Sequence, residues 1–376
     1  MKGEYYTKPP PREKDSRPLR TGRSLRARPL IYTVALLTLS TITLSTLGQA
    51  PVRGETPQPE LITPDTQEAI DAGLEYLAKR QIKNGDNRGA FGTTGYSGGV
   101  AVASLAGVAF MASGDPPGQG KYGQHVDRAV QFLMRNTQAT GYVSAPGTND
   151  RMYGHGFATL CMAEAHGMSN RQELRKKLEL AVKLIVDTQS DQGGWRYMPQ
   201  KQDADLSVTI CQIMGLRAAA ESGLSVPKET RRRAIDYVKK SQQTDGSFMY
   251  TIPSGHSTLA LTAAGLVSFH SAGIYDTREV RKGLDWMIRF VPGGPDEAGA
   301  RGHNYFYAHY YAVQAAWHGG GEYWAKWYPA IRNELLQRRN RADGSWSDPS
   351  VCSEYATAMA CIILQMPNNY LPIFGE

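Results

Sequence analysis

The sequence predicts an all-α protein folded as an (α/α)6 barrel of six helical hairpins. Three observations lead to this class: a repeat of about 50 residues, two alternating kinds of helix, and a glycine turn followed by an aromatic residue. The aromatic residues after the turns are Phe91, Tyr142, Trp195, Phe248 and Trp346. They are 51, 53, 53 and 98 residues apart, and the last interval is about twice the others. A further unit is therefore expected near residue 297, which makes six units.

Each unit begins with an amphipathic segment in which apolar residues recur at helical spacing and charges occupy one face. These segments are residues 70–81, 129–138, 181–189, 234–243, 283–290 and 330–340. A helix of this kind covers a core with its apolar side and meets water with the other. We therefore expect these six helices on the outside of the barrel.

The second helix of each unit is almost uncharged and rich in small residues. The segments are residues 100–114, 156–167, 207–223, 257–273, 307–321 and 355–365. A helix that is apolar all round is buried, so these six form the predicted inner ring. An open solenoid is the alternative, and closure is favoured because the terminal units lack a polar capping face.

The positive charge of the chain is concentrated at its N-terminus. Residues 1–30 hold nine Lys/Arg and three Asp/Glu, whereas the rest holds 33 and 32. A nearly neutral body without a basic stripe argues against nucleic-acid binding. The basic segment is followed by an uncharged run at 30–47 and by small residues at 48–50, which is the order of a secretory signal.

Residues 1–50 are therefore expected to export the protein to a periplasmic or other extracytoplasmic location. A cleaved signal peptide is one interpretation, and a membrane anchor formed by residues 30–47 is the other, because 18 residues approach the length needed to span a bilayer. Prolines in 51–64 indicate a linker, and 65–376 is the predicted barrel. The four cysteines show no C-x-x-C spacing and are expected to be buried free thiols.

The turn itself carries a recognisable motif. Gln189 to Trp195 reads Gln-x-x-x-Gly-x-Trp, Gln242 to Phe248 repeats it with Phe, and Asn340 to Trp346 keeps all but the Gln. This resembles the QW repeat of squalene–hopene cyclases and the wider terpenoid cyclase and protein prenyltransferase group, over about residues 65–376. The resemblance implies the same barrel. Physically, the Gln amide can cap a neighbouring helix while the aromatic ring fills the gap between outer helices.

The candidate acids are Asp203 and Asp205, at the start of an inner helix. The stretch resembles the Asp-x-Asp-Asp-Thr motif of class II terpene cyclases, with Leu206-Ser207 in place of Asp-Thr. The resemblance implies that Asp205, at the middle position, protonates an alkene or epoxide. Such a carboxyl must keep its proton through burial and a neighbouring carboxylate. A structural role for Asp205 as a helix N-cap is the alternative.

Further candidate substrate-binding residues are expected at the end of the barrel where the inner helices begin, near Asp203 and Asp205. His155, His256 and Glu354 lie at or just before the start of inner helices, and Tyr305, Tyr307 and Tyr311 belong to the densest aromatic cluster of the chain. Aromatic faces can stabilise carbocations, although core packing is an equally simple role for them. A protein-prenyltransferase-like zinc site lacks its thiolate, because Ser207 stands at that position, so no metal or cofactor is expected.

Two functions remain open from the sequence. One is an exported cyclase-like enzyme that carries out acid-catalysed cyclisation or isomerisation of a terpenoid or other lipid, for which a second barrel would have to come from another chain. The other is a non-catalytic barrel that binds a lipid, a peptide or a protein partner. A carbohydrate-active enzyme is a weaker third, since Asp205 with Glu354 is its only carboxylate pair.

Overall fold

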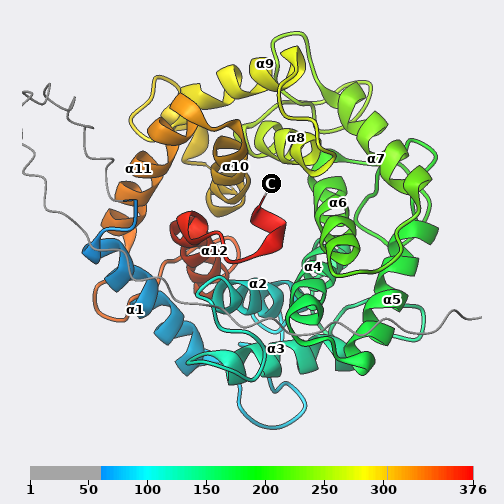
Figure 1. The fold of residues 1–376 in the computed structure, drawn as a ribbon, viewed down its shortest axis with the longest axis vertical. Coiled ribbons are helices and arrows are strands. Elements are labelled where there is room, and N and C mark those ends of the chain that lie inside the picture. Colours follow the sequence, from blue (N-terminus) through cyan, green and yellow to red (C-terminus); the bar gives the residue numbers. More distant parts are fainter. Residues whose placement is uncertain (1–60, 303, 376) are drawn as a thin grey trace, which may run out of the picture. The chain divides into compact units, whose positions relative to one another are not determined.

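The computed structural model describes residues 61–302 and 304–375, and these form a closed double ring of helices (Figure 1). The segments expected to act as signal, anchor and most of the linker lie outside the described residues. The outer helices are α1 (Pro64–Arg80), α3 (Gly123–Arg135), α5 (Gln172–Asp187), α7 (Lys228–Ser241), α9 (Arg278–Met287) and α11 (Gly321–Arg338). The inner helices are α2 (Val100–Met111), α4 (Arg151–Ser169), α6 (Leu206–Glu221), α8 (Leu259–Ser271), α10 (Tyr305–Gly319) and α12 (Ser353–Gln365).

The inner helices pack in chain order, and α12 packs against α2, so the ring closes. The predicted all-α (α/α)6 barrel is confirmed, and the open solenoid is wrong. Four short 3-10 helices complete the fold: η1 (Ile288–Phe290), η2 (Glu297–Ala300), η3 (Met366–Asn368) and η4 (Pro372–Phe374). None of the described helices is long and apolar enough to cross a membrane.

All six outer helices begin earlier than the sequence predicts. α5 begins at Gln172 rather than near 181, and α11 begins at Gly321 rather than near 330. The first turns of α5 are mostly polar, but Leu174 and Leu178 are buried there at helical spacing, so the earlier start agrees with the apolar pattern. In α11, Pro329 lies within the helix. Proline removes one backbone hydrogen bond there, and the fully buried Trp327 and Tyr328 hold the segment against the core.

In five of the six units a glycine turn meets the next outer helix. Gly193 has φ of 100°, and a methyl group on its Cα would lie 2.3 Å from the carbonyl oxygen of Arg233 in α7. Only glycine tolerates both the left-handed backbone and this approach. The same contact with an outer-helix carbonyl recurs at Gly89, Gly141, Gly246 and Gly344. The last of these rests on Ala72 of α1 and so links the end of the chain to its first unit.

The recurring glutamine of the motif strengthens the same junction. The Gln189 side-chain amide donates to the carbonyl of Gly193 at 2.7 Å and to that of Thr230 in α7 at 2.9 Å. Gln81 and Gln242 make the equivalent pair of bonds in their own units. Each amide thus ties its turn to the first turn of the next outer helix, where the sequence predicted a capping role.

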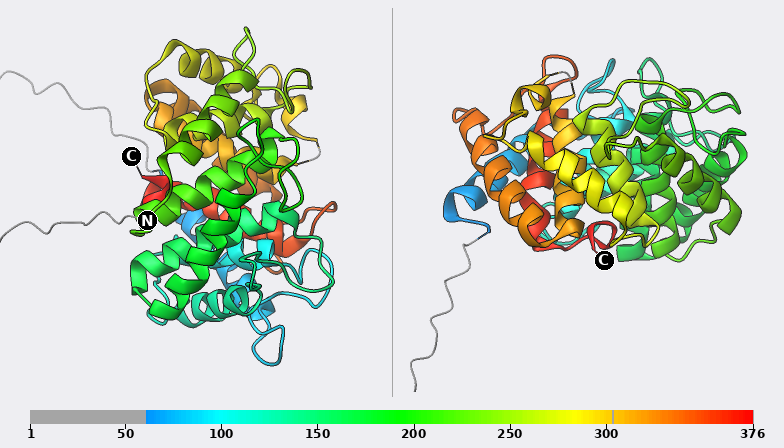
Figure 2. Two further views of the ribbon diagram at one scale, coloured as in Figure 1. Left: turned by 90° about the vertical axis from the view of Figure 1, so that its right-hand side faces the viewer. Right: turned by 90° about the horizontal axis from the view of Figure 1, so that it is seen from above.

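The C-terminal turn η4 closes one end of the barrel, on the side where the inner helices end (Figures 1 and 2). Phe374 is buried and its ring lies 6.5 Å from that of Tyr310. Arg217, in the last turn of α6, donates to the carbonyl of Gly375 at 2.9 Å. Beneath this turn Glu164 is buried, and burial together with Glu221 raises the pKa of its carboxyl to about 8.

The cysteines are unpaired, as expected. Cys161, Cys211 and Cys361 are buried and Cys352 is half-buried. Burial raises the pKa of the Cys211 thiol to about 11, so this group is a neutral thiol at neutral pH.

The turn glycines should be far less replaceable than glycines that need only a left-handed backbone. Gly193→Ala should lower the free energy of unfolding by about 2 kcal/mol or more, because steric overlap adds to the cost of positive φ. Gly223→Ala is the matched control, since Gly223 has φ of 90° but open space around its Cα. Urea unfolding of the two variants measures the difference. Equal losses would contradict the proposed junction.

The raised pKa of Glu164 predicts a pH dependence of stability. The folded carboxyl keeps its proton up to about pH 8, whereas the unfolded one has an ordinary pKa of 4.5. Its contribution is therefore fully present below pH 4.5 and is lost as the pH rises towards 8. Glu164→Gln should remove this decline. The test is to measure the free energy of unfolding of the wild type and of Glu164→Gln at pH 5 and at pH 8. If the change between the two pH values were the same in both proteins, Glu164 would not be the cause of the decline.

Candidate functional site

Asp205 is placed by the turn that precedes it. Its backbone N–H donates to the carbonyl of Trp195 at 3.0 Å, so the end of the loop returns beside its start. The side chain is fully buried, and its Oδ1 accepts hydrogen bonds from the Val208 N–H at 2.9 Å and from the Ser207 hydroxyl at 2.7 Å. Asp205 is therefore the N-cap of α6, which is the structural role considered for it from the sequence.

Hydroxyl groups extend outward from this carboxyl. The Tyr153 hydroxyl lies 2.6 Å from Ser207 Oγ. Because Ser207 donates to Asp205, its oxygen accepts from Tyr153, and the three groups form a hydrogen-bonded chain. Tyr307 of α10 reaches the same place and donates to the carbonyl of Ser207 at 2.7 Å. Its hydroxyl also lies 3.4 Å from Cys211 Sγ.

The second carboxyl oxygen of Asp205 differs from the first. Oδ2 is buried and has no hydrogen-bond partner among the described residues, and Arg196 Nε lies 3.9 Å away. Burial raises the pKa of Asp205, while bonds from Ser207 and Val208 and the charge of Arg196 oppose the increase. Since Oδ1 already accepts two hydrogen bonds, a proton on this carboxyl belongs on Oδ2.

Asp203 does not form a carboxylate pair with Asp205. It is exposed, and Arg196 makes an ion pair with it at the surface. The Arg196 guanidinium also lies near Asp205, so its positive charge interacts with both carboxyl groups. The expectation that a neighbouring carboxylate keeps the proton on Asp205 is therefore wrong, and burial raises the pKa instead.

A rim of aromatic and basic side chains surrounds Tyr153. Its ring lies 6.0 Å from that of Tyr197, whose hydroxyl is bonded to that of Tyr250. The guanidinium of Arg151 lies 5.4 Å from the centroid of the Tyr197 ring. Arg151 has φ of 49°, a conformation that costs free energy in residues other than glycine. His256 is exposed and stacks on Tyr250 at 5.6 Å, so it belongs to this rim.

Below the rim, side chains fill the axis of the barrel. Tyr307 and Tyr311 share the inward face of α10, with ring centroids 4.9 Å apart. Tyr310 meets Phe157 of α4 on the far side of the ring at 6.2 Å and Phe374 beneath it. A ligand at this end of the barrel would therefore contact the rim and Tyr307 rather than a deep channel.

Two predicted site residues have structural partners instead. His155 is fully buried, and its Nδ1 accepts from the Val143 N–H while its Nε2 donates to the carbonyl of Ala181, both at 3.2 Å. Burial lowers its pKa to about 4, so it is neutral and both ring nitrogens are used. Glu354 is held by Arg80 of α1 at 2.8 Å. Its carboxylate is thus neutralised by an outer helix and does not pair with Asp205.

Tyr305 is buried on the other side of α10 from Tyr307. The guanidinium of Arg338 in α11 lies 4.2 Å from its ring centroid, and His309 lies 4.5 Å away. Its expected place beside Tyr307 and Tyr311 is therefore wrong, because residues two apart on a helix face different directions. No group of three or more His, Cys, Asp or Glu among the described residues could hold a metal ion.

No known family model and no curated protein matches this chain by sequence. Solved structures match its fold. The chain is similar to an inactive variant of the α-1,6-mannanase of Salegentibacter sp. HEL1_6 bound to α-1,6-mannotriose, with 7% identity and a TM-score of 0.60. The match covers 80% of this chain and 98% of the mannanase.

Two further similar structures belong to different enzymes. One is the type II terpene cyclase MstE from Scytonema, with 15% identity, a TM-score of 0.57 and coverage of 83% and 100%. The other is cellobiose 2-epimerase from Bacillus thermoamylovorans, with 11% identity, a TM-score of 0.58 and coverage of 80% and 99%. At these identities the shared property is the helical toroid fold, and the matches do not single out the squalene-cyclase-like group.

Most of the rim was not predicted from the sequence. Tyr153, Arg196, Tyr197 and Tyr250 come from the start of α4 and from two loops, and only the closed ring brings them together. One signal was present: Tyr197 and Tyr250 each lie two residues after the aromatic residue of a turn motif. Equivalent positions in successive units lie side by side in a ring, so this repeat of tyrosines indicates a shared surface.

The capping role of Asp205 can be separated from any chemical role. Asp205→Ala should lower the free energy of unfolding by about 1–2 kcal/mol, because the N–H of Val208 loses its acceptor. Asp205→Asn should cost much less, since asparagine caps helices about as well as aspartate. Thermal or urea unfolding compares them. A loss for the Asn variant as large as that for Ala would contradict the cap assignment.

Proposed function

We propose that the barrel binds a small isoprenoid or other lipid at its rim and that Asp205 acts on it as a general acid. The observation that carries this proposal is a fully buried carboxyl below a rim of tyrosines, whose Oδ2 has no hydrogen-bond partner in the part of the chain that the structure describes. Burial favours the protonated form. A carboxyl of this kind can donate a proton that an exposed aspartate would already have lost.

The proposed step is protonation of an alkene or epoxide, followed by isomerisation or cyclisation. For this step the substrate must displace the side chains that cover Asp205 Oδ2. The proton then leaves Oδ2 for a carbon of the double bond, or for the epoxide oxygen, and leaves a carbocation on the substrate. Loss of a proton from a neighbouring carbon completes an isomerisation. Tyr153 and Tyr307, whose hydroxyls bond to Ser207, are rings that could stabilise the cation. The hydroxyl chain through Ser207 offers a route to reprotonate Asp205.

The similar structures support aspartate chemistry in this fold without showing it here. The mannanase variant described as inactive has two aspartates replaced by asparagine, and MstE is a type II terpene cyclase. The order of the leader further supports export, with residues 30–47 as an alternative anchor. A second barrel from another chain could cover the rim.

A non-catalytic binding protein is the second candidate. Arg196 near Oδ2 favours the ionised carboxylate, and the two hydrogen bonds of Oδ1 serve the cap of α6. On this proposal the rim binds a lipid, a peptide or a partner protein, and Asp205 has only a structural role. The filled axis is compatible with a ligand that stays at the surface.

Asp205→Asn is the deciding variant, because it removes the acid while it preserves the cap. The wild-type protein should convert at least one member of a panel of squalene, oxidosqualene and prenylated aromatic acids, followed by mass spectrometry of extracted products. The variant should lose at least about a hundredfold in turnover. Asp203→Asn, at the exposed partner of Arg196, should stay within about twofold. Undiminished turnover in Asp205→Asn, or binding without conversion by the wild type, would overturn the catalytic proposal.

A further inference from the structure

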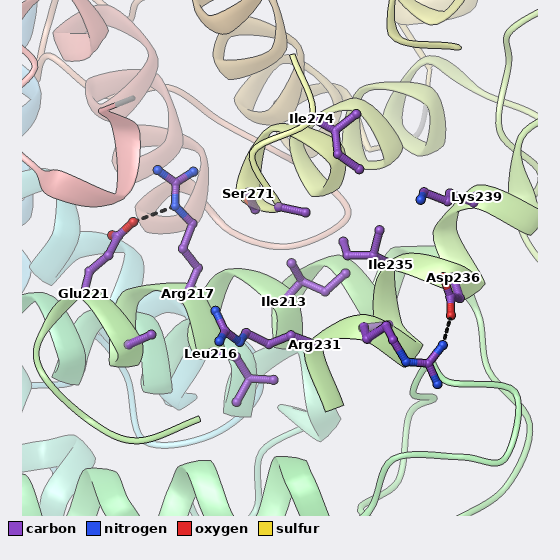
Figure 3. Close-up of a pocket in the computed structure, with 14 residues that line it drawn as sticks. Ile213, Leu216, Arg217, Glu221, Arg231, Ile235, Asp236, Lys239, Ser271 and Ile274 are labelled. Atoms are coloured by element: carbon purple, nitrogen blue, oxygen red, sulfur yellow. Dashed lines mark hydrogen bonds and ion pairs between the residues drawn. The ribbon is translucent and has the colours of Figure 1, made fainter. Parts of the chain in front are cut away.

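A groove lies between outer helix α7 and the inner helices α6 and α8 (Figure 3). It involves the second half of α6, so it is remote from Asp205, which precedes the first residue of that helix. Its volume is about 420 Å³, within the range typical of small-molecule sites. Ile213, Ile235 and Ile274 face the space between the helices. The groove is therefore a second concave surface, independent of the rim.

The groove exists because α7 departs from the repeat. In each of five outer helices one backbone carbonyl meets the turn glycine of the preceding unit, and these carbonyls define equivalent positions. Two residues earlier, four of these helices carry fully buried aliphatic side chains: Ile70, Val126, Leu178 and Val280. In α7 the same position is Arg231, which is exposed and lines the groove. An aliphatic plug is thus replaced by a cation beside an open apolar space.

The charges around the groove do not balance. Arg217 pairs with Glu221 at 2.7 Å, and Arg232 pairs with Asp236 at 2.5 Å. Arg231 and Lys239 are both exposed and have no carboxylate partner in the described part of the chain. The lining therefore carries two uncompensated positive charges over a floor of isoleucine, leucine and alanine.

We propose that this groove binds a single-chain fatty acid, with its carboxylate at Arg231 and its alkyl chain along Ile213 and Ile235. Apolar burial and charge complementarity together call for a ligand with one apolar tail and one anionic head. The guanidinium can hold a carboxylate through two hydrogen bonds. The volume of about 420 Å³ suits one alkyl chain. This site is separate from the proposed acid chemistry and does not depend on it.

The test uses dodecanoate as the probe and the whole protein, with binding measured by titration calorimetry. Arg231→Leu restores the aliphatic residue of the other units, so it should fold well, fill the groove and weaken dodecanoate binding at least tenfold. Lys240→Leu is the matched control, since it removes an exposed positive charge from the same helix outside the groove. It should bind dodecanoate with unchanged affinity. Dodecanol should bind at least tenfold more weakly than dodecanoate.

Several results would overturn the proposal. These are no dodecanoate binding by the wild type, equal binding by Arg231→Leu, or equal affinity for dodecanol. Binding to phosphatidylglycerol vesicles that depends on Arg231, without binding of dodecanoate, would instead assign the groove to a membrane surface. Asp205→Asn should leave dodecanoate binding unchanged, so that failure of the acid chemistry and failure of this site are distinguished.

Discussion

The contact between a turn glycine and the next outer helix is the constraint on which the barrel depends. Each of five units places a left-handed glycine against an outer-helix carbonyl, so the outer helices cannot shift independently. At Gly344 this contact falls on Ala72 of the first unit and turns a row of hairpins into a closed ring. The inner helices can then be almost free of charge, because the outer ring shields them on every side. Closure thus comes from one local geometry used repeatedly.

The same contact positions the candidate site. The turn at Gly193 sets the place of Trp195, whose carbonyl receives the N–H of Asp205. The buried Trp195 also donates its indole N–H to the carbonyl of Ile185, which holds the turn against α5. The position of the Asp205 carboxyl is therefore set by the repeated turn, whereas the residues around it differ from those at the equivalent positions of the other units. Arg231 in α7 is a second departure. In a protein built from repeats, positions that differ from their equivalents in the other units are candidates for a functional role.

The sequence predicted the fold well because periodicity is local and the glycine turns recur. The first turns of α5 were missed because charged residues separate the buried Leu174 and Leu178. Only part of the candidate site could be predicted from the sequence. Asp205 was found because it precedes a helix, but the face on which Tyr305 lies depends on the rotation of α10 in the ring. The two bonds of His155 come from the preceding turn and from α5, and neither partner can be recognised before the chain is folded.

The central claim is that burial keeps a proton on Asp205 under conditions in which an ordinary aspartate is ionised. The most direct measurement is a carbon-13 NMR titration of side-chain carboxyls in the wild-type protein, with Asp205→Asn used to assign the signal. We expect the Asp205 carboxyl to titrate with a midpoint above the ordinary value of 3.8, because it is buried. A midpoint at or below that value would show that Arg196 and the helix cap determine the charge of this group, and would contradict an acid role.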